Sequence, residues 1–458
     1  MIDNRSIYLN THIVSPAQKN GLHNTFQTMK DYEKKGLYHR LIPIYQDKYG
    51  NLNTNIILPY VNKNNITDLI VVNNIDDSER LASKHVKKMP HLDHILFNSI
   101  ISTTCVDDWK NQRSQYQPSF SVHTELVTLL PISVKRAKYC VDLLWELCES
   151  GSKSVNMNDF LLNETMAQLQ LAMFGVSDDF QVKTNKNIRK VFSGENSPTF
   201  TQTYFKEMVD NMDQWTGPLS KAFDLSVDKK ELFGNIIIFS FAGHDTTGNT
   251  LSWLLYELCK NKSCQSKLHH EIDLFWMIQK NKNIEYNDFK RLPYLTKCIM
   301  ETLRLWSPIP NGTFRELIKD DYVVGKNGKH IKLPKGTYIQ IPNWSRHRNP
   351  DLWGDDVNTF NPDREFEDDE LWENSVINTY NPSTPRFSPF TYGPRDCIGK
   401  NFSQIEMRII LLYLLKSYKF SLTKKETAYR EYNTFTLGFL DGLYMDVERR
   451  ECRTQAKL

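Results

Sequence analysis

Long apolar runs are missing from this sequence of 458 residues. No stretch approaches the roughly 18 consecutive apolar residues that a transmembrane helix needs. The first 20 residues, MIDNRSIYLNTHIVSPAQKN, contain neither the apolar segment nor the small-residue cleavage site of a secretory signal peptide. We therefore expect a cytoplasmic protein with no signal peptide and no N-terminal membrane anchor, and peripheral association with a membrane stays open.

An excess of charge of one sign is also missing. The chain has 57 Lys and Arg residues against 54 Asp and Glu residues, a formal net charge of +3. Such a small excess provides no general electrostatic field for nucleic acid, so no nucleic-acid partner is expected. The eight cysteines are scattered, which argues against a disulfide framework and favours reduced thiols. They are Cys105, Cys140, Cys148, Cys259, Cys264, Cys298, Cys397 and Cys452.

Repeats and linkers are absent as well. No internal period is found, and no Gly/Ser-rich or Pro-rich segment divides the sequence. We expect a single domain over residues 1–458, present as a monomer. The least hydrophobic segment, 181–200, is expected to be an exposed connection within that domain.

The residues that are present suit a large helical core. Hydrophobic residues make up 40% of the chain and aromatic residues 12%. Helical apolar patterns dominate from about 105 to 305, including 134–150, 157–175 and 231–261. The last would run about 45 Å if unbroken. It is apolar on nearly all sides in its first half, so it should lie in the interior.

Strand patterns cluster nearer the C-terminus. Segment 321–341 carries Asn327-Gly328 and Pro334-Lys335-Gly336 as turns between β-rich pieces. Segment 435–447 contains Asp441-Gly442, which predicts a hairpin pivoting on that dipeptide. The fold class expected is mainly α with small β-sheets.

One cysteine occupies an unusual position, in the loop FTYGPRDCIGK at 390–400. An apolar-periodic helix is predicted for 404–419, so the positive end of its dipole would favour a Cys397 thiolate. Gly393 and Gly399 permit close approach of a flat ligand, and Arg395 could pair with an anionic group. An inert, buried cysteine is the alternative. A lone thiolate does not suit structural zinc, which wants four ligands, whereas it suits haem iron.

The same loop resembles the haem-binding signature of the cytochrome P450 family, FxxGxRxCxG. Every fixed position is present, as Phe390, Gly393, Arg395, Cys397 and Gly399. The resemblance implies the cytochrome P450 fold, heme b (iron protoporphyrin IX) as cofactor, and Cys397 as the axial thiolate ligand of its iron.

The segment AGHDTT at 242–247 resembles the family's [AG]Gx[DE]T[TS] motif. The resemblance implies that Ala242 and Gly243 border the haem and that Asp245 and Thr246 relay protons for oxygen activation. The plainer alternative is that Thr246 bonds back to the preceding helical turn and Asp245 finds a basic partner.

Two further motifs imply a buried ionic triad. ETLRLWSPIP at 301–310 contains ExxR, with Glu301 and Arg304 three residues apart, a spacing that is common on ordinary helices. FNPDREF at 360–366 resembles the family's FxPxRF segment, and its Arg364 would complete a structural triad. The phenylalanine that normally follows this arginine is displaced by Glu365, with Phe366 next.

Several cations are candidates to bind haem propionates. WKNQR at 109–113 places Trp109 and Arg113 one turn apart on a helix, and in the family such a pair binds a propionate. Arg315 matches another propionate position less specifically, and Arg395 would add a third cation. A solvated arginine beside a half-buried tryptophan is the alternative for the first pair.

Two clusters have plainer explanations. Zinc-type ligands occur at 259, 264, 269 and 270, but on a continuous helix their spacing points them in several directions. The basic residues Lys135, Arg136 and Lys138 fit a solvated helix face. The alternative, implied by the resemblance, is docking of an acidic redox partner.

The resemblance covers residues from about 80 to 447 and implies a haem-thiolate monooxygenase. No flavin or NAD motif is present, so electrons from NADPH would arrive through a flavoprotein reductase of the NADPH-cytochrome P450 reductase type or a ferredoxin. AGHDTT and ETLRLWSPIP look closest to the eukaryotic, fatty-acid-hydroxylating type.

The substrate expected from this resemblance is hydrophobic and lipid-like. Its pocket would be lined by parts of 92–106, the front of the long helix, and a hairpin tip near Leu440. The alternatives are a haem-thiolate isomerase or dehydratase of lipid peroxides, in which the threonine is commonly lost, and a non-catalytic haem-binding protein.

Overall fold

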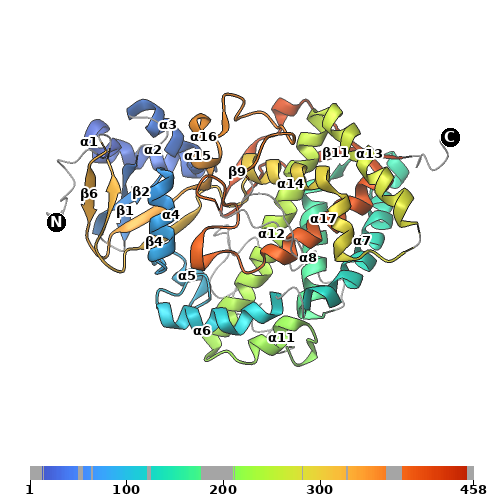
Figure 1. Ribbon diagram of the computed structural model, residues 1–458, viewed down its shortest axis with the longest axis horizontal. Coiled ribbons are helices and arrows are strands. Elements are labelled where there is room, and N and C mark those ends of the chain that lie inside the picture. Colours follow the sequence, from blue (N-terminus) through green and yellow to red (C-terminus); the bar gives the residue numbers. More distant parts are fainter. Residues whose placement is uncertain are drawn as a thin grey trace.

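The computed structural model describes residues 13, 15–49, 55–62, 65–120, 125–176, 210, 212–280, 282–325, 328–367 and 384–450. Most helices gather on one side of the molecule, and the largest sheet lies on the other side together with the N-terminal helices (Figure 1). The α-helices are α1 (Pro16–Asn20), α2 (Leu22–Lys34), α3 (Tyr38–Tyr49), α4 (Ile75–Lys84), α5 (Asp93–Leu96), α6 (Val106–Tyr116), α7 (Val127–Leu147), α8 (Met157–Leu169), α11 (Pro218–Phe223), α12 (Lys229–Lys260), α13 (Lys262–Gln279), α14 (Pro293–Leu305), α15 (Asn343–His347), α16 (Pro350–Trp353) and α17 (Lys400–Ser417). The strands are β1 (Ile56–Asn62), β2 (Asn65–Val71), β3 (Val155–Asn156), β4 (Thr313–Glu316), β5 (Asp321–Val324), β6 (His330–Leu333), β7 (Tyr338–Ile341), β8 (Tyr418–Leu422), β9 (Glu431–Asn433), β10 (Leu437–Phe439) and β11 (Tyr444–Arg449). The short helical turns are η1 (Gln117–Phe120), η3 (Glu149–Gly151), η4 (Gln170–Phe174), η5 (Met212–Gln214), η6 (Tyr286–Arg291), η8 (Gly393–Arg395) and η9 (Glu426–Ala428).

The 32-residue helix α12 crosses the middle of the molecule (Figure 1). It begins at a regular cap, where the Asp228 side chain accepts a hydrogen bond from the backbone N–H of Glu231 at 2.8 Å. From Gly234 onward its side chains are almost all buried, which agrees with the apolar pattern. This confirms the interior helix predicted for 231–261.

Helices α8, α14 and α17 pack against α12 and, together with α7, share the largest apolar core with it. Helix α8 packs closely along α12, because Gly243 and Gly248 leave no side chain between them. A Cβ at Gly243 would come 2.7 Å from the Leu169 side chain, and one at Gly248 would come 2.9 Å from that of Leu162. The two glycines therefore set the distance between the helices.

Four small sheets are formed by the described residues. The largest has the strand order β1-β2-β7-β4, with β2 and β7 parallel and the other neighbours antiparallel. Its register pairs Ile56 with Val71 and Leu69 with Tyr338. The other sheets are β5-β6, β3-β11-β8 and β9-β10. The combination of many helices with small sheets confirms the expected fold class.

The predicted hairpin over 435–447 is wrong in its pairing. Strand β10 pairs with β9, so the hairpin tip lies at 434–436, while β11 pairs with β8 and β3. Gly442 has a φ of +78°, and a Cβ there would approach the Asn156 side chain at 2.5 Å. The Asp441-Gly442 turn therefore exists, but it passes the chain from one sheet to another.

The other elements predicted from periodicity agree with the structure. Segment 134–150 falls largely in α7, segment 157–175 in α8 and η4, and segment 404–419 largely in α17. Segment 321–341 forms β5, β6 and β7, and β5 pairs with β6 as a hairpin. The connection predicted for 181–200 lies outside the described residues.

A search of the described residues finds no helix with both the length and the apolar character that crossing a membrane requires.

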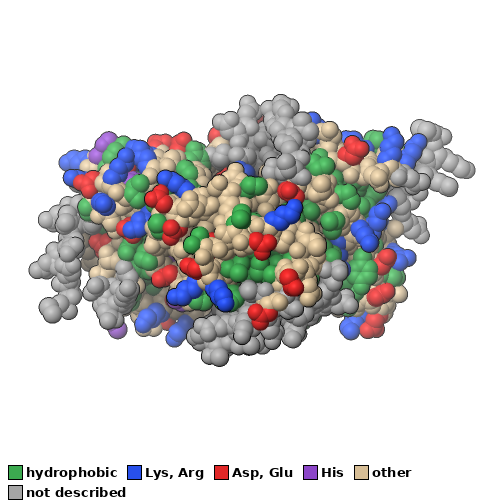
Figure 2. Space-filling view, turned by 90° about the horizontal axis from the view of Figure 1, so that it is seen from below, with side chains coloured by type: hydrophobic (Ala, Val, Ile, Leu, Met, Phe, Trp, Pro, Cys, Tyr) green, Lys and Arg blue, Asp and Glu red, His purple; other side chains and the backbone are tan. Residues whose placement is uncertain are grey.

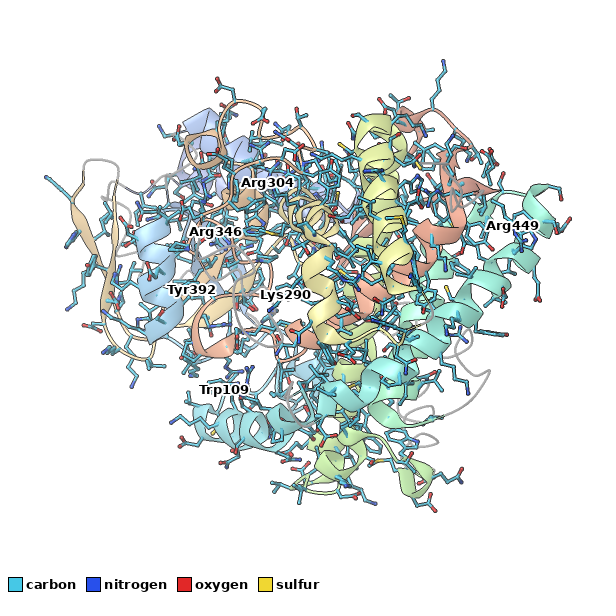
Figure 3. All side chains as sticks on the ribbon, turned by 45° about the vertical axis from the view of Figure 1, so that its right-hand side comes forward. Trp109, Lys290, Arg304, Arg346, Tyr392 and Arg449 are labelled. Atoms are coloured by element: carbon cyan, nitrogen blue, oxygen red, sulfur yellow. The ribbon has the colours of Figure 1, made fainter. Side chains whose placement is uncertain are left out.

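The predicted ionic triad forms in the interior. Arg304 Nε and Nη2 donate to the two carboxylate oxygens of Glu301 at 2.8 and 2.7 Å, and both side chains are 0% exposed. Arg364 Nε donates to the same carboxylate at 3.3 Å. The remaining Arg304 nitrogen donates to the carbonyls of His347 and Val357. Figure 3 shows Arg304 deep among the side chains.

The displaced phenylalanine of the arginine segment still packs. Glu365 is exposed, whereas Phe366 is buried, with its ring centroid 5.6 Å from that of Trp353 and 5.1 Å from that of Phe387. The extra residue therefore shifts the phenylalanine along the chain without removing it from the core.

Replacing Glu301 with glutamine should lower the free energy of unfolding by about 3–5 kcal/mol, because it leaves the fully buried Arg304 guanidinium without a carboxylate, whereas Arg364 keeps its ion pair with Asp356. Chemical denaturation followed by circular dichroism measures this loss.

The matched control is Asp363→Asn, which removes the carboxylate of an exposed ion pair with Lys267. We expect a change below about 1 kcal/mol there. A Glu301→Gln variant no less stable than this control would contradict a structural role for the triad.

Candidate functional site

The cysteine loop is held by its own backbone and by two helices. The N–H of Cys397 donates to the carbonyl of Phe390 at 2.8 Å, and the N–H of Asp396 donates to that of Gly393 at 3.0 Å. Gly393 has a φ of +75°, and a Cβ there would lie 3.1 Å from the Ala82 carbonyl oxygen of α4. Helix α17 begins three residues after Cys397, as the sequence predicts.

The Cys397 side chain is accessible to solvent. Even so, the protein atoms around it raise the pKa of its thiol above the ordinary value by disfavouring the charged form. The N–H of Gly399 lowers this pKa, Asp396 raises it, and the charges of Arg113 and Lys400 lower it. Because burial dominates, a thiolate here needs further positive charge, which a bound metal cation would supply.

Three buried cations lie near this loop. Lys88, Arg315 and Arg395 are all buried, and within the described part of the chain none forms an ion pair with Asp or Glu. Among the described residues, Arg315 Nε and Nη2 have no hydrogen-bond partner. Burial lowers the pKa of Lys88, with Arg315 and Arg395 contributing. Burial also lowers the pKa of Arg315 and of Arg395 to about 9.

Such an arrangement fits an anionic ligand. Buried charges without partners are costly, and an Arg side chain with two unused donors can hold a carboxylate. The propionates of a haem would satisfy the cations, and its iron would satisfy the thiolate of the neighbouring cysteine. The residues present therefore fit the haem that the resemblance implies.

Lys88 is a candidate that the sequence analysis missed. It forms a β-bridge with Arg315, and its Nζ donates to Thr313 Oγ1 at 3.3 Å. Its neighbour Lys87 points the other way and pairs with Glu316 at 2.6 Å. Nothing in the sequence distinguishes the buried lysine from the accessible one.

Helix α6 connects to the loop through Trp109 and Arg113. The Arg395 guanidinium carbon lies 4.3 Å from the centroid of the Trp109 ring, a cation–π contact, and Figure 3 shows where Trp109 lies on α6. Arg113 donates to the carbonyl and the carboxylate of Asp396 at 2.7 and 2.8 Å. In this structure Trp109 therefore supports Arg395, and Arg113 anchors the residue before the cysteine.

Part of α12 is accessible in an otherwise buried stretch. Ala242, Gly243 and Thr246 are half-buried, although the residues around them are buried. Thr246 Oγ1 donates to the Ala242 carbonyl at 2.8 Å, as the plainer alternative predicts. Asp245 is buried, and its carboxylate accepts hydrogen bonds from Thr436 and from Asn249 at 3.3 Å. The acid and the alcohol of the motif thus have different surroundings.

The expected pocket segments are brought together only in part. Segment 92–106 packs on the front of α12, where the N–H of Ile100 donates to Asn235 Oδ1 at 2.8 Å. Leu440, by contrast, is 41% exposed and does not form a hairpin tip. The tip carries Phe435, whose ring centroid lies 5.3 Å from that of Phe241 on α12.

Only part of the basic cluster on α7 lies on a solvated helix face. Arg136 is half-buried and pairs with Glu164 at 2.7 Å, while Lys135 and Lys138 are exposed. Where the structure describes the chain, no group of three or more His, Cys, Asp or Glu residues is placed to hold a metal ion. On the face seen from below, basic, acidic and apolar side chains are interspersed (Figure 2).

Replacing Arg315 with methionine should have opposite effects with and without an anionic ligand. Without haem, the variant loses a buried charge that has no partner, so its Tm should stay the same or rise. With haem bound, a propionate loses its cation, and the stability gained from haem should fall by about 3–5 kcal/mol. Thermal unfolding of the haem-free and haem-loaded proteins measures both effects.

Arg80→Met is the control, because Arg80 pairs with Asp77 and Asp321 inside the protein. It should destabilise both forms equally. The ligand assignment is wrong if Arg315→Met behaves in the same way.

Comparison with known proteins gives one family. A family model described as Cytochrome P450 matches residues 208–442, a little over half of the chain. Human Cytochrome P450 4F8 is 34% identical over 210 residues, which are 46% of this chain and 37% of that protein. Human Cytochrome P450 4F3 is 36% identical over 211 residues, which are 46% and 37% of the two chains.

A relative from Drosophila melanogaster, Cytochrome P450 6a2, is 32% identical over 225 residues, which are 49% of this chain and 42% of that protein. The matched part thus spans less than half the length of each of these relatives. Residues 208–442, which the family model matches, include the whole of α12, the ionic triad and the cysteine loop. The family match and the geometry of these three features agree, and the chain belongs to the cytochrome P450 family.

Proposed function

We propose that this protein is a haem-thiolate monooxygenase that inserts one atom of dioxygen into an apolar substrate. The observation that carries the proposal is a cluster of buried cations that have no carboxylate partner among the described residues, beside an accessible cysteine sulfur. Two nitrogens of one of them, Arg315, have no hydrogen-bond acceptor there. Haem with a cysteine thiolate ligand supplies the oxygen chemistry, since the thiolate donates electron density that favours O–O cleavage.

Cys397 would be the thiolate ligand of the haem iron. The backbone bond to Phe390 and the ion pair between Arg113 and Asp396 fix the position of the cysteine loop that carries it. Lys88, Arg315 and Arg395 would hold the propionates, with Trp109 supporting Arg395.

Thr246 and Asp245 would manage protons. Thr246 carries the hydroxyl on the accessible face of α12, and because it donates its own proton to the Ala242 carbonyl, its oxygen can accept a hydrogen bond from a water molecule and orient it. Asp245 is screened from that face by burial, so it can exchange protons without opening the site to bulk water.

The substrate proposed is lipid-like, as in fatty-acid hydroxylation. Apolar and aromatic side chains line the front of α12 and the β9-β10 tip, including Phe239, Phe241 and Phe435. Electrons would come from NADPH through a separate flavoprotein reductase or ferredoxin, because the sequence has no flavin or NAD motif.

Replacing Cys397 with alanine should abolish the thiolate-type absorption spectrum of the reduced, CO-bound form, because the iron would lose its sulfur ligand. Absorption spectroscopy of the haem-loaded variant makes the measurement. Cys105→Ala is the control, since Cys105 is the other exposed cysteine among the described residues. If the Cys397 variant kept the spectrum, the ligand would have to lie elsewhere.

Replacing Thr246 with alanine should leave haem bound but raise the hydrogen peroxide released per NADPH several-fold, because proton delivery would be disrupted. Peroxide and NADPH are measured together in the presence of reductase. The control is Thr250→Ala, one turn later on α12, which removes a buried hydroxyl that also donates to a carbonyl of the preceding turn. This variant should not change the amount of peroxide released per NADPH. Equal ratios in both variants would rule out the role of Thr246.

A further inference from the structure

The β9-β10 hairpin follows one face of α12. Phe435 meets Phe241, Thr436 meets Asp245 and Asn249, and the Leu437 carbonyl accepts a hydrogen bond from Trp253 Nε1 at 2.9 Å. The contacting residues on α12 are four apart, so they form a continuous stripe along the helix. The hairpin therefore lies against the helix over at least three turns.

Buried polar side chains form a hydrogen-bonded cluster in the middle of this contact. Asp245 Oδ2 accepts hydrogen bonds from Thr436 Oγ1 and from Asn249 Nδ2 at 3.3 Å, and the same amide nitrogen lies 3.2 Å from Thr436 Oγ1. Asn249 Oδ1 in turn accepts from Asn158 Nδ2 of α8 at 2.9 Å. Asp245, Asn249 and Thr436 are all buried, so these bonds decide the orientation of the carboxylate.

The hairpin does not need the Thr436 hydroxyl in order to dock. The Trp253 hydrogen bond holds the β10 backbone, and the Phe439 ring stacks on the Trp253 ring with centroids 3.9 Å apart. A Cβ at Gly438 would come 2.8 Å from Asn249 Oδ1, so backbone and helix already touch. The Thr436 hydroxyl therefore has another effect. It donates a second hydrogen bond to Asp245 Oδ2, the oxygen that also accepts from Asn249.

We propose that Thr436 is a positioning residue that orients the Asp245 carboxylate and thereby controls its proton exchange with the Thr246 side of α12. The proposal rests on the monooxygenase function proposed above. It assigns to the hairpin tip a role in proton delivery, and Thr436 lies outside every motif in the sequence. Thr436 does not contact the reacting atoms, because it acts through Asp245.

The test compares three variants of the haem-loaded protein. Thr436→Val keeps the shape but removes the hydroxyl, and Thr436→Ser keeps the hydroxyl. Trp253→Phe removes the other hydrogen bond between the hairpin and α12 while leaving Asp245 untouched. The readouts are peroxide released per NADPH, the solvent isotope effect on oxygen consumption, and the Tm.

We expect Thr436→Val to release several-fold more peroxide and to show a changed solvent isotope effect, whereas Thr436→Ser stays close to the starting protein. Trp253→Phe should lower the Tm without changing either proton-dependent readout. The role of Thr436 is overturned if the Val variant matches the Trp253→Phe variant in both readouts, since the hydroxyl would then only tie the hairpin down.

A double-mutant cycle tests the contact without turnover. If Thr436 acts through Asp245, the Tm of Thr436→Val combined with Asp245→Ala should fall little further than that of the more damaging single variant. Additive losses would overturn the assignment.

Failure of the monooxygenase function is recognised separately, because the unaltered protein would then consume no oxygen with reductase and NADPH. In that case the Tm cycle alone decides whether Thr436 orients Asp245.

Discussion

A positive charge inside a protein needs a negative partner, and this molecule meets that requirement in two different ways. In the triad, Glu301 lies between Arg304 and Arg364, and every nitrogen of Arg304 has an oxygen acceptor. Near the cysteine loop, two nitrogens of Arg315 have no acceptor within the part of the chain that the structure describes. Since the same fold supplies a buried carboxylate where it stabilises structure, its absence from the second cluster indicates a place for a ligand with acidic groups.

The cysteine loop obeys the same electrostatic constraint with the opposite sign. Burial disfavours a charged sulfur at Cys397, and Asp396 beside it adds a negative charge. Arg113 and Lys400 offset that carboxylate, each at 2.8 Å or less, so the loop is held by ion pairs that surround the sulfur without neutralising it. Iron would complete the balance on the sulfur, as two propionates would complete it on the cations. A single ligand would therefore compensate both the charge on the sulfur and the charges of the cations. It would also link the cysteine loop to α4, α6 and β4.

Sequence reasoning succeeded where the determinant is local and failed where it is distant. The interior course of α12 follows from continuous apolarity, and the Glu301–Arg304 pair follows from its i,i+3 spacing on α14. The Asp441-Gly442 turn was found, but its strands pair with β9 and β8, whose residues the turn does not encode. Lys88 could not be predicted from the sequence. Side chains alternate along an extended segment, so one of the two neighbouring lysines faces the interior, but the sequence does not indicate that it is Lys88 and not Lys87.

Helical geometry explains why the acid of α12 depends on a distant hairpin. Successive residues of an α-helix are rotated by about 100°, so Asp245 and Thr246 cannot face the same space even though they are adjacent. Thr246 shares the accessible face with Ala242, one turn earlier, whereas Asp245 shares the hairpin face with Phe241 and Asn249. The Asp245 carboxylate can therefore act on the accessible face only in a side-chain rotamer that its hydrogen-bond donors allow. The two donors, Thr436 and Asn249, therefore affect the proton chemistry of the motif as much as Asp245 and Thr246 do.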